Sequence, residues 1–191
     1  MTEAPHFDQR DQSVNTQTNI GQANQVIIQS SAFPQDLSVP HQLPSPPKDF
    51  MGREEEIRSL LDKFDRGATI TGLRGMGGVG KTALALVLAD QLKGSFSAGQ
   101  IYLDMQGTSK NPLKPDKAMA HVIRSFLGPG FEVPEDQNGL CGFYRTVLSE
   151  RKALILLDNA ADHVQVEPLV PPAGSALLIT SRNKFAMDGL K

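Results

Sequence analysis

The glycine-rich stretch GMGGVGKT, from Gly75 to Thr82, constrains the fold of this chain more than any other feature. It matches the pattern G-x-x-x-x-G-K-[ST] in full. It also lies between the apolar run ATITGL at 68–73 and the strong helix-forming run KTALALVLADQL at 81–92. A buried strand, a glycine turn and a helix in this order direct several backbone N–H groups at one anion. The stretch therefore predicts a P-loop.

Each residue type in this loop has a chemical reason to stand where it does. The glycines let the backbone curl around a phosphate at positive φ without a steric cost. Lys81 is placed to reach the β- and γ-phosphates, and Thr82 offers a hydroxyl to Mg²⁺, a hard ion that prefers oxygen ligands. The predicted phosphate-binding residues are Gly75, Met76, Gly77, Gly78, Val79, Gly80, Lys81, Thr82 and Ala83.

A second acidic position is needed, because a P-loop site holds Mg²⁺ with an acid at the end of another strand. The apolar run ALILLD at 153–158 ends in Asp158, and it is the one run of this form in the sequence. Thr82 and Asp158 are therefore the predicted metal residues, and Lys81 and Asp158 are predicted to act in any catalysis. Asp104 ends the run QIYLDM, where a solvent-exposed strand end is favoured over a place in the nucleotide cleft.

The residue after Asp158 is Asn159, where many P-loop ATPases have a second acid that orients the attacking water. An amide accepts a hydrogen bond from water but does not take up a proton usefully at neutral pH. The sequence therefore predicts that ATP hydrolysis is slow or depends on another group. Asp162 is expected one helical turn after Asp158, where a solvated helix acid is favoured over a role as that group.

Arg182 follows the apolar run ALLIT at 176–180. An arginine just past a strand that neighbours the phosphate site contacts the γ-phosphate through charge-assisted hydrogen bonds. Its place after the P-loop and the acidic strand favours this role over that of an ordinary surface arginine.

Apolar segments after residue 50 alternate between helix-like and strand-like periods, which predicts an α/β fold with a mostly parallel, doubly wound sheet. The strands are near-continuous runs of Leu, Ile and Val, as expected when helices cover both faces. Predicted strands are 68–73, 100–105, 153–158 and 176–180, and predicted helices are 53–64, 81–92, 115–127 and 138–150.

The N-terminal part differs in composition. Residues 1–31 form a polar, Gln/Asn-rich tail that is predicted to be disordered, and residues 32–49 carry five prolines and predict an extended linker. The segment TQTNIGQANQVIIQ within the tail has two interpretations. It is either a polar arm or, with its amides beside a β-branched run, a cross-β segment.

Composition limits the function classes. The formal net charge of −2 provides no basic field for nucleic acid, so no nucleic-acid partner is predicted. Cys141 is the single cysteine, which leaves no intrachain disulfide and no cysteine-based metal site. The N-terminus lacks the basic start and apolar run of a secretory signal, and no apolar run approaches the roughly 18 residues of a membrane span. A cytoplasmic protein without a membrane segment is predicted.

Four motifs in order resemble the NB-ARC ATPases of the STAND class: FMGREEEI at 50–57, GLRGMGGVGKTALA at 72–85, ALILLDNAAD at 153–162 and LLITSR at 177–182. The resemblance covers about residues 48–190. It implies a P-loop NTPase core that binds ADP or ATP with Mg²⁺, and a γ-phosphate sensor at Arg182. It also implies that Phe50, Met51, Gly52 and Arg53 contact the base and sugar. The usual role of the family is to stay closed with ADP, then exchange it for ATP, open and oligomerise.

The sequence departs from this family pattern at Asn159, and it ends at Lys191, before the helical and winged-helix domains that complete the family's nucleotide pocket. The prediction is therefore a truncated NB-ARC-type domain at 50–191, belonging either to a longer protein or to a reduced gene product. The tail is similar to short amyloid signalling motifs, which implies self-association or an effector partner. An ordinary P-loop ATPase, a non-enzymatic adaptor acting through its tail and a transcription regulator are the alternatives.

Overall fold

A four-stranded parallel sheet forms the centre of the domain. The computed structural model describes residues 39–65 and 70–185, which belong to one compact unit, and the tail at 1–31 lies outside the described residues. Its strands are β1 (Ile70–Arg74), β2 (Gly99–Asp104), β3 (Ala153–Ala160) and β4 (Ala176–Ser181). They lie in the order β1-β4-β3-β2, and each neighbouring pair is parallel.

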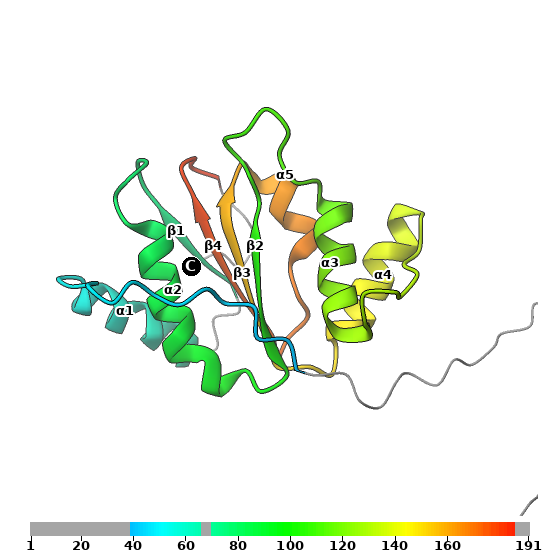
Figure 1. The fold of residues 1–191 in the computed structure, drawn as a ribbon, viewed down its shortest axis with the longest axis horizontal. Coiled ribbons are helices and arrows are strands. Elements are labelled where there is room, and N and C mark those ends of the chain that lie inside the picture. Colours follow the sequence, from blue (N-terminus) through cyan, green and yellow to red (C-terminus); the bar gives the residue numbers. More distant parts are fainter. Residues whose placement is uncertain (1–38, 66–69, 186–191) are drawn as a thin grey trace, which may run out of the picture. The chain divides into compact units, whose positions relative to one another are not determined.

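Helices cover both faces of this sheet (Figure 1). One face is covered by α1 (Glu54–Asp65) and α2 (Lys81–Leu92), and the other by α3 (Pro115–Leu127) with α4 (Gln137–Leu148) and the short α5 (His163–Val166). Two 3₁₀ turns, η1 (Lys93–Ser95) and η2 (Glu167–Leu169), complete the connections. The predicted doubly wound α/β fold is confirmed.

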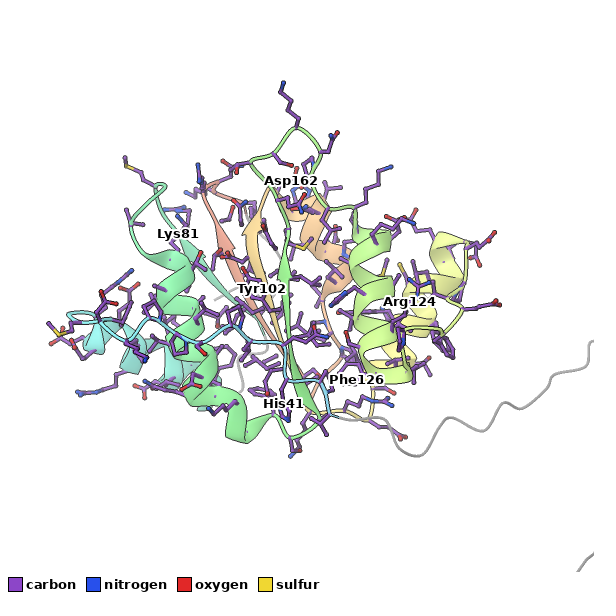
Figure 2. The ribbon with its side chains drawn as sticks, in the orientation of Figure 1. His41, Lys81, Tyr102, Arg124, Phe126 and Asp162 are labelled. Atoms are coloured by element: carbon purple, nitrogen blue, oxygen red, sulfur yellow. The ribbon has the colours of Figure 1, made fainter. Side chains whose placement is uncertain are left out.

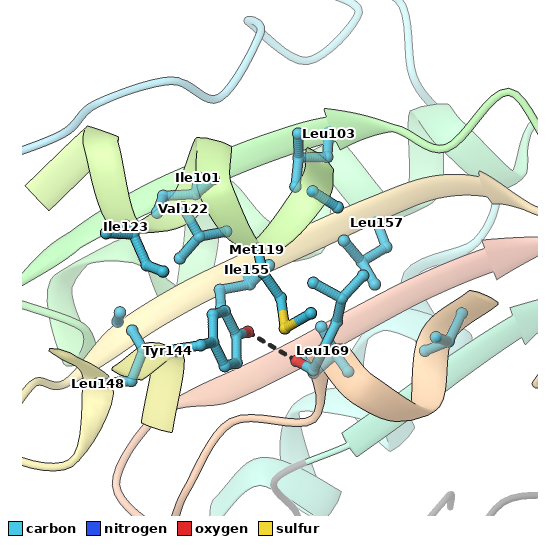
Figure 3. Packing of buried hydrophobic residues seen from close by; sticks show 14 of the residues in the cluster. Ile101, Leu103, Met119, Val122, Ile123, Tyr144, Leu148, Ile155, Leu157 and Leu169 are labelled. Carbon is cyan, nitrogen blue, oxygen red and sulfur yellow. Dashed lines mark hydrogen bonds between the residues drawn. The ribbon is translucent and has the colours of Figure 1, made fainter. Parts of the chain in front are cut away.

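The apolar runs of the strands divide between two hydrophobic clusters. Leu154 and Leu156 of β3 pack with α1 and α2, while Ile155 and Leu157 pack with α3, α4 and α5. Successive side chains of a strand point to opposite faces, so a strand covered on both sides must be apolar at every position. Figure 3 shows the second cluster, where the Tyr144 hydroxyl donates a hydrogen bond of 2.7 Å to the carbonyl of Leu169.

Strand β3 ends at Ala160, two residues later than the sequence predicts, because Ala160 pairs with Ser181 after an irregularity in the register. Asn159 lies at this irregularity with φ of 56°. The prediction that Asp162 lies one helical turn after Asp158 is therefore wrong. Asp162 instead begins α5, where its carboxylate accepts a hydrogen bond of 3.0 Å from the backbone N–H of Gln165.

The described part of the linker is extended and lies along the edge of β2. The Gln100 N–H donates to the Pro40 carbonyl (2.7 Å), and the Gln42 N–H donates to the Gln100 carbonyl (2.9 Å). Leu43 and Phe50, further along, pack against the cluster formed with α1 and α2. Within 39–65 and 70–185, none of the helices has the length and apolar character that crossing a membrane requires.

Candidate functional site

The carboxyl ends of all the described strands lie at one edge of the sheet, since every neighbouring pair is parallel. In open α/β sheets this edge is where ligands bind. A cavity of about 410 Å³ lies there. Its lining residues are Gly77, Gly78, Gly80, Lys81, Thr82, Ala83, Asp104, Asp158, Asn159, Thr180, Ser181 and Arg182. The structure thus brings most of the predicted P-loop, Asp158 and Arg182 to one cavity, whereas Gly75, Met76 and Val79 of the predicted set do not line it.

The loop between β1 and α2 has the backbone of an anion site. Gly78 and Gly80 have φ of 83° and 77°, a left-handed conformation that side chains disfavour. Gly80 begins α2, and no side chain caps the helix there, so its first N–H groups lie at the cavity. Lys81, labelled in Figure 2, donates hydrogen bonds of 2.7 Å to the carbonyls of Gly75 and Met76.

Asp158 is the most connected group of the cavity, and its residue is only 8% exposed. Its Oδ1 accepts hydrogen bonds from the hydroxyls of Thr82 (2.8 Å) and Thr180, and its Oδ2 accepts one from the Tyr102 hydroxyl (3.2 Å). Burying a carboxylate is costly unless it is hydrogen-bonded. The three hydroxyls, from α2, β4 and β2, offset that cost.

Sequence reasoning missed Tyr102 and Thr180 as site residues. Thr180 is the last polar residue of the run ALLIT, and its hydroxyl also accepts a hydrogen bond of 2.9 Å from the Asn159 N–H. Tyr102 has the same parity on β2 as Asp158 has on the neighbouring β3, where Asp104 pairs with Asp158. The sequence places Tyr102 two residues before Asp104 on the same face of its strand. That this face adjoins Asp158 follows only from the pairing of β2 with β3.

The donor set fits Mg²⁺. Thr82 and Asp158 supply a hydroxyl and a carboxylate in contact at 2.8 Å, in a cavity that Lys81 also lines. Within the described ranges, no group of three or more His, Cys, Asp or Glu side chains forms a denser metal cluster. Mg²⁺ at a nucleotide site keeps waters and phosphate ligands and needs only one or two protein groups. Thr82 and Asp158 remain the predicted metal residues.

Arg182 lies against the P-loop. A Cβ atom placed on Gly77 would be 3.3 Å from the Cζ of the Arg182 guanidinium, so the two segments touch across the cavity. Asp104 is exposed and lines the same cavity, and its Oδ1 accepts a hydrogen bond of 2.8 Å from the Gln106 N–H. Asp104 is thus an exposed strand end, as the sequence predicts, and it also lines the cavity, because it pairs with Asp158 of β3.

Of the residues predicted to contact base and sugar, Arg53 is the one that the structure joins to the P-loop. Its Nη1 donates a hydrogen bond of 3.1 Å to the Val79 carbonyl, and its guanidinium forms an ion pair of 2.6 Å with Glu56. Phe50 packs against the α1 and α2 cluster, whereas Met51 is 83% exposed. Gly52, between Met51 and Arg53, has φ of 84°.

Comparison with known proteins agrees with this geometry. No protein-family model matches the sequence. The regulatory protein AfsR of Streptomyces coelicolor is 34% identical over 180 residues, which is 87% of this chain and 18% of that protein. A nucleotide-binding leucine-rich repeat (NLR)-like protein of Hyaloscypha variabilis is 28% identical over 59% of this chain and 12% of its own length. The chain contains an NB-ARC-like P-loop domain.

A solved structure supports the fold of this NB-ARC-like domain. The crystal structure of Cdc6p from Pyrobaculum aerophilum matches it with a TM-score of 0.51 and 19% identity. The match covers 72% of this chain and 40% of that one. At this identity the likeness concerns the fold alone. The domain spans less than a fifth of the length of the two sequence relatives described above.

The phenol of Tyr102 in the NB-ARC-like domain is held protonated by its surroundings. Partial burial, and after it the negative charge of Asp158, raises the pKa of Tyr102 from 10.0 to about 12. Burial alone raises the pKa of Tyr144. Tyr102 therefore remains a hydrogen-bond donor to Asp158 throughout the neutral range.

The raised pKa values of Tyr102 and Tyr144 predict how the folded protein titrates at alkaline pH. The chain has two tyrosines and no tryptophan, so phenolate absorbance near 295 nm reports on Tyr102 and Tyr144. A raised pKa in the folded state contributes stability that is complete below about pH 10, and that is lost as the pH rises toward 12. We expect no phenolate signal near pH 10 while the circular dichroism is native. A step with a midpoint near pH 10 in folded protein would contradict the partly buried position of Tyr102 beside Asp158.

Proposed function

We propose that this domain binds ADP and ATP with Mg²⁺ as the nucleotide switch module of a STAND or NLR-like signalling protein, with slow or absent hydrolysis. The observation that carries the proposal is the convergence of Lys81, Thr82, Asp158 and Arg182 on one cavity at the carboxyl ends of the strands. Two cations, a hydroxyl and a carboxylate in one place suit a polyphosphate with its metal ion.

Each group has a distinct role in this proposal. The P-loop N–H groups and Lys81 bind the β- and γ-phosphates, and Thr82 and Asp158 hold Mg²⁺, which neutralises phosphate charge when bound. Arg182 contacts the γ-phosphate, which is absent from ADP. Phe50, Met51, Gly52 and Arg53 contact the base and sugar, with Arg53 already anchored to the P-loop through the Val79 carbonyl.

Slow hydrolysis is proposed from the group beside Asp158. Asn159 lines the cavity, and its amide donates a hydrogen bond of 3.4 Å to the Thr108 hydroxyl. An amide supplies no useful base. Asp104 is a second carboxylate in the cavity, and this observation favours the alternative of an ordinary P-loop ATPase. A cytoplasmic location and a place within a longer protein belong to the same proposal.

Replacing Lys81 tests nucleotide binding directly. We expect Lys81→Ala to weaken ADP and ATP binding roughly ten- to hundredfold, since hydrogen bonds to charged groups are worth about 1.5–3 kcal/mol each. Lys93→Ala is the matched control, because Lys93 follows the same helix but forms an exposed ion pair with Asp90. Isothermal titration calorimetry with each nucleotide gives the affinities.

Measurements on the wild-type protein distinguish the nucleotide switch, the ordinary P-loop ATPase and the non-enzymatic adaptor. Co-purified ADP and phosphate release at less than one turnover per minute support the switch. Continuous turnover that Lys81→Ala abolishes favours the ordinary ATPase. Absence of any nucleotide binding by the folded wild-type protein refutes the proposal and leaves the adaptor.

Arg182 is expected to distinguish the two nucleotides. If its guanidinium contacts the γ-phosphate, Arg182→Ala weakens ATP binding by roughly tenfold or more and leaves ADP binding within about twofold. Arg145→Ala, on the exposed side of α4, is the control for loss of one positive charge. The ratio of ATP to ADP affinity is the measured quantity, and equal losses for both nucleotides would refute the sensor role.

For the tail, which lies outside the described residues, we propose self-association or capture of an effector through cross-β pairing. The support is compositional: amide side chains beside Val26, Ile27 and Ile28, with low charge and without proline. A peptide covering 7–31 is expected to form fibrils that bind thioflavin T, and the same peptide with Ile27→Pro is the control. Persistent monomeric disorder of the unmodified peptide would exclude the cross-β interpretation.

A further inference from the structure

The carboxylate of Asp158 has a different set of partners on each oxygen. Oδ1 accepts from Thr82 and Thr180, whereas Oδ2 accepts from the Tyr102 hydroxyl at 3.2 Å. We propose that Tyr102 is a positioning residue, whose hydroxyl fixes the Asp158 carboxylate so that the oxygen of Thr82 stays available to Mg²⁺. The inference rests on the proposed function, since it concerns how the Mg²⁺–nucleotide complex is held.

The direction of the Thr82 hydroxyl proton explains why the position of Asp158 affects metal binding at Thr82. A threonine hydroxyl has one proton and two lone pairs. When the Thr82 proton points to Oδ1 of Asp158, as the distance of 2.8 Å requires, its lone pairs remain free for a metal ion. This holds only while one of the two equivalent carboxylate oxygens faces Thr82. The arrangement of Asp158 therefore decides what Thr82 offers to the cation.

Rotation of the carboxylate is the motion that Tyr102 restrains. The terminal torsion of aspartate is broad, so packing alone fixes its two oxygens poorly. Within the described residues, Tyr102 is the one side-chain donor to Oδ2. Without the Tyr102 hydroxyl, Oδ2 loses this partner, and the carboxylate is free to rotate to positions in which both oxygens approach the threonine hydroxyls. The arrangement that leaves the Thr82 lone pairs free for Mg²⁺ is then only one of several arrangements of the Asp158 carboxylate.

The position of Tyr102 makes the hydroxyl separable from the ring. Tyr102 pairs with Leu156 of β3, and its ring packs against the cluster formed with α1 and α2. Phenylalanine keeps that packing and removes a single oxygen atom. Tyr144 is the matched tyrosine, because its hydroxyl bonds the Leu169 carbonyl on the opposite face of the sheet, within the core shown in Figure 3.

The experiment compares Tyr102→Phe, Tyr144→Phe and the wild type, using a fluorescent ADP analogue titrated in EDTA and at a series of Mg²⁺ concentrations. For Tyr102→Phe we expect the Mg²⁺ concentration at half-maximal effect to rise roughly three- to tenfold, with the affinity in EDTA unchanged. For Tyr144→Phe we expect a lower thermal midpoint and the Mg²⁺ dependence of the wild type.

A second readout does not need the Tyr102 variant to fold. In Tyr144→Phe, Tyr102 is the one remaining tyrosine in a chain without tryptophan, so tyrosine emission reports on its hydroxyl. Saturating Mg²⁺ in the presence of ADP is expected to change this emission, since the metal draws on the carboxylate that the phenol contacts. Emission that Mg²⁺ leaves unchanged would contradict the proposal.

The outcomes distinguish a failure of the proposed nucleotide binding from a failure of the positioning role of Tyr102. If the wild type binds no nucleotide at any Mg²⁺ concentration, the proposed function fails, and the role of Tyr102 fails with it. If the wild type binds with a clear Mg²⁺ dependence and Tyr102→Phe shows the same dependence, only the positioning role is overturned. A loss for Tyr102→Phe that is equal in EDTA and in Mg²⁺ also overturns it, because that result indicates a general structural defect.

Discussion

The buried carboxylate of Asp158 is the interaction on which the rest of the site depends. A charge with 8% of its residue exposed requires partners, and these come from α2, β2 and β4 rather than from its own strand. The hydrogen bonds therefore tie the P-loop helix to two strands that are distant in sequence. They do so with hydroxyls, which leave the net negative charge in place for a cation. Lysine or arginine partners would have neutralised that charge and removed the reason for Mg²⁺ to bind.

The sheet makes this arrangement possible because it brings strand ends together. Strand β3 is flanked by β4 on one side and β2 on the other, and both pairs are parallel. The end of β3 therefore lies between Thr180 and Tyr102, with α2 packed over the same face. Leu154 and Leu156, which precede Asp158 on that face, hold α2 close to the sheet. Core packing thus sets the distance between Thr82 and Asp158.

The local patterns of the sequence were sufficient for the fold class and for the P-loop, because a glycine motif between a strand and a helix needs no information from elsewhere in the chain. The places of Lys81, Thr82, Asp158 and Arg182 at the ends of elements predict a shared site, and all four line the cavity. The hydrogen bond of Tyr102 to Asp158 and the place of Asp104 in the cavity cannot be predicted in this way, since both follow from the register of β2 against β3. Asp162 was misplaced because the irregular pairing of Ala160 with Ser181 extends β3 beyond its apolar run.

The linker connects these observations to the rest of the chain. Its described part is held by Gln100 of β2, and Arg53, beyond its end, donates a hydrogen bond to the Val79 carbonyl of the P-loop. Gln100 and Tyr102 are two residues apart on β2, so the strand that donates a hydrogen bond to the Asp158 carboxylate also anchors the linker. The segment before α1 therefore contacts the P-loop through Arg53 and the start of β2 through Gln100, which does not line the cavity.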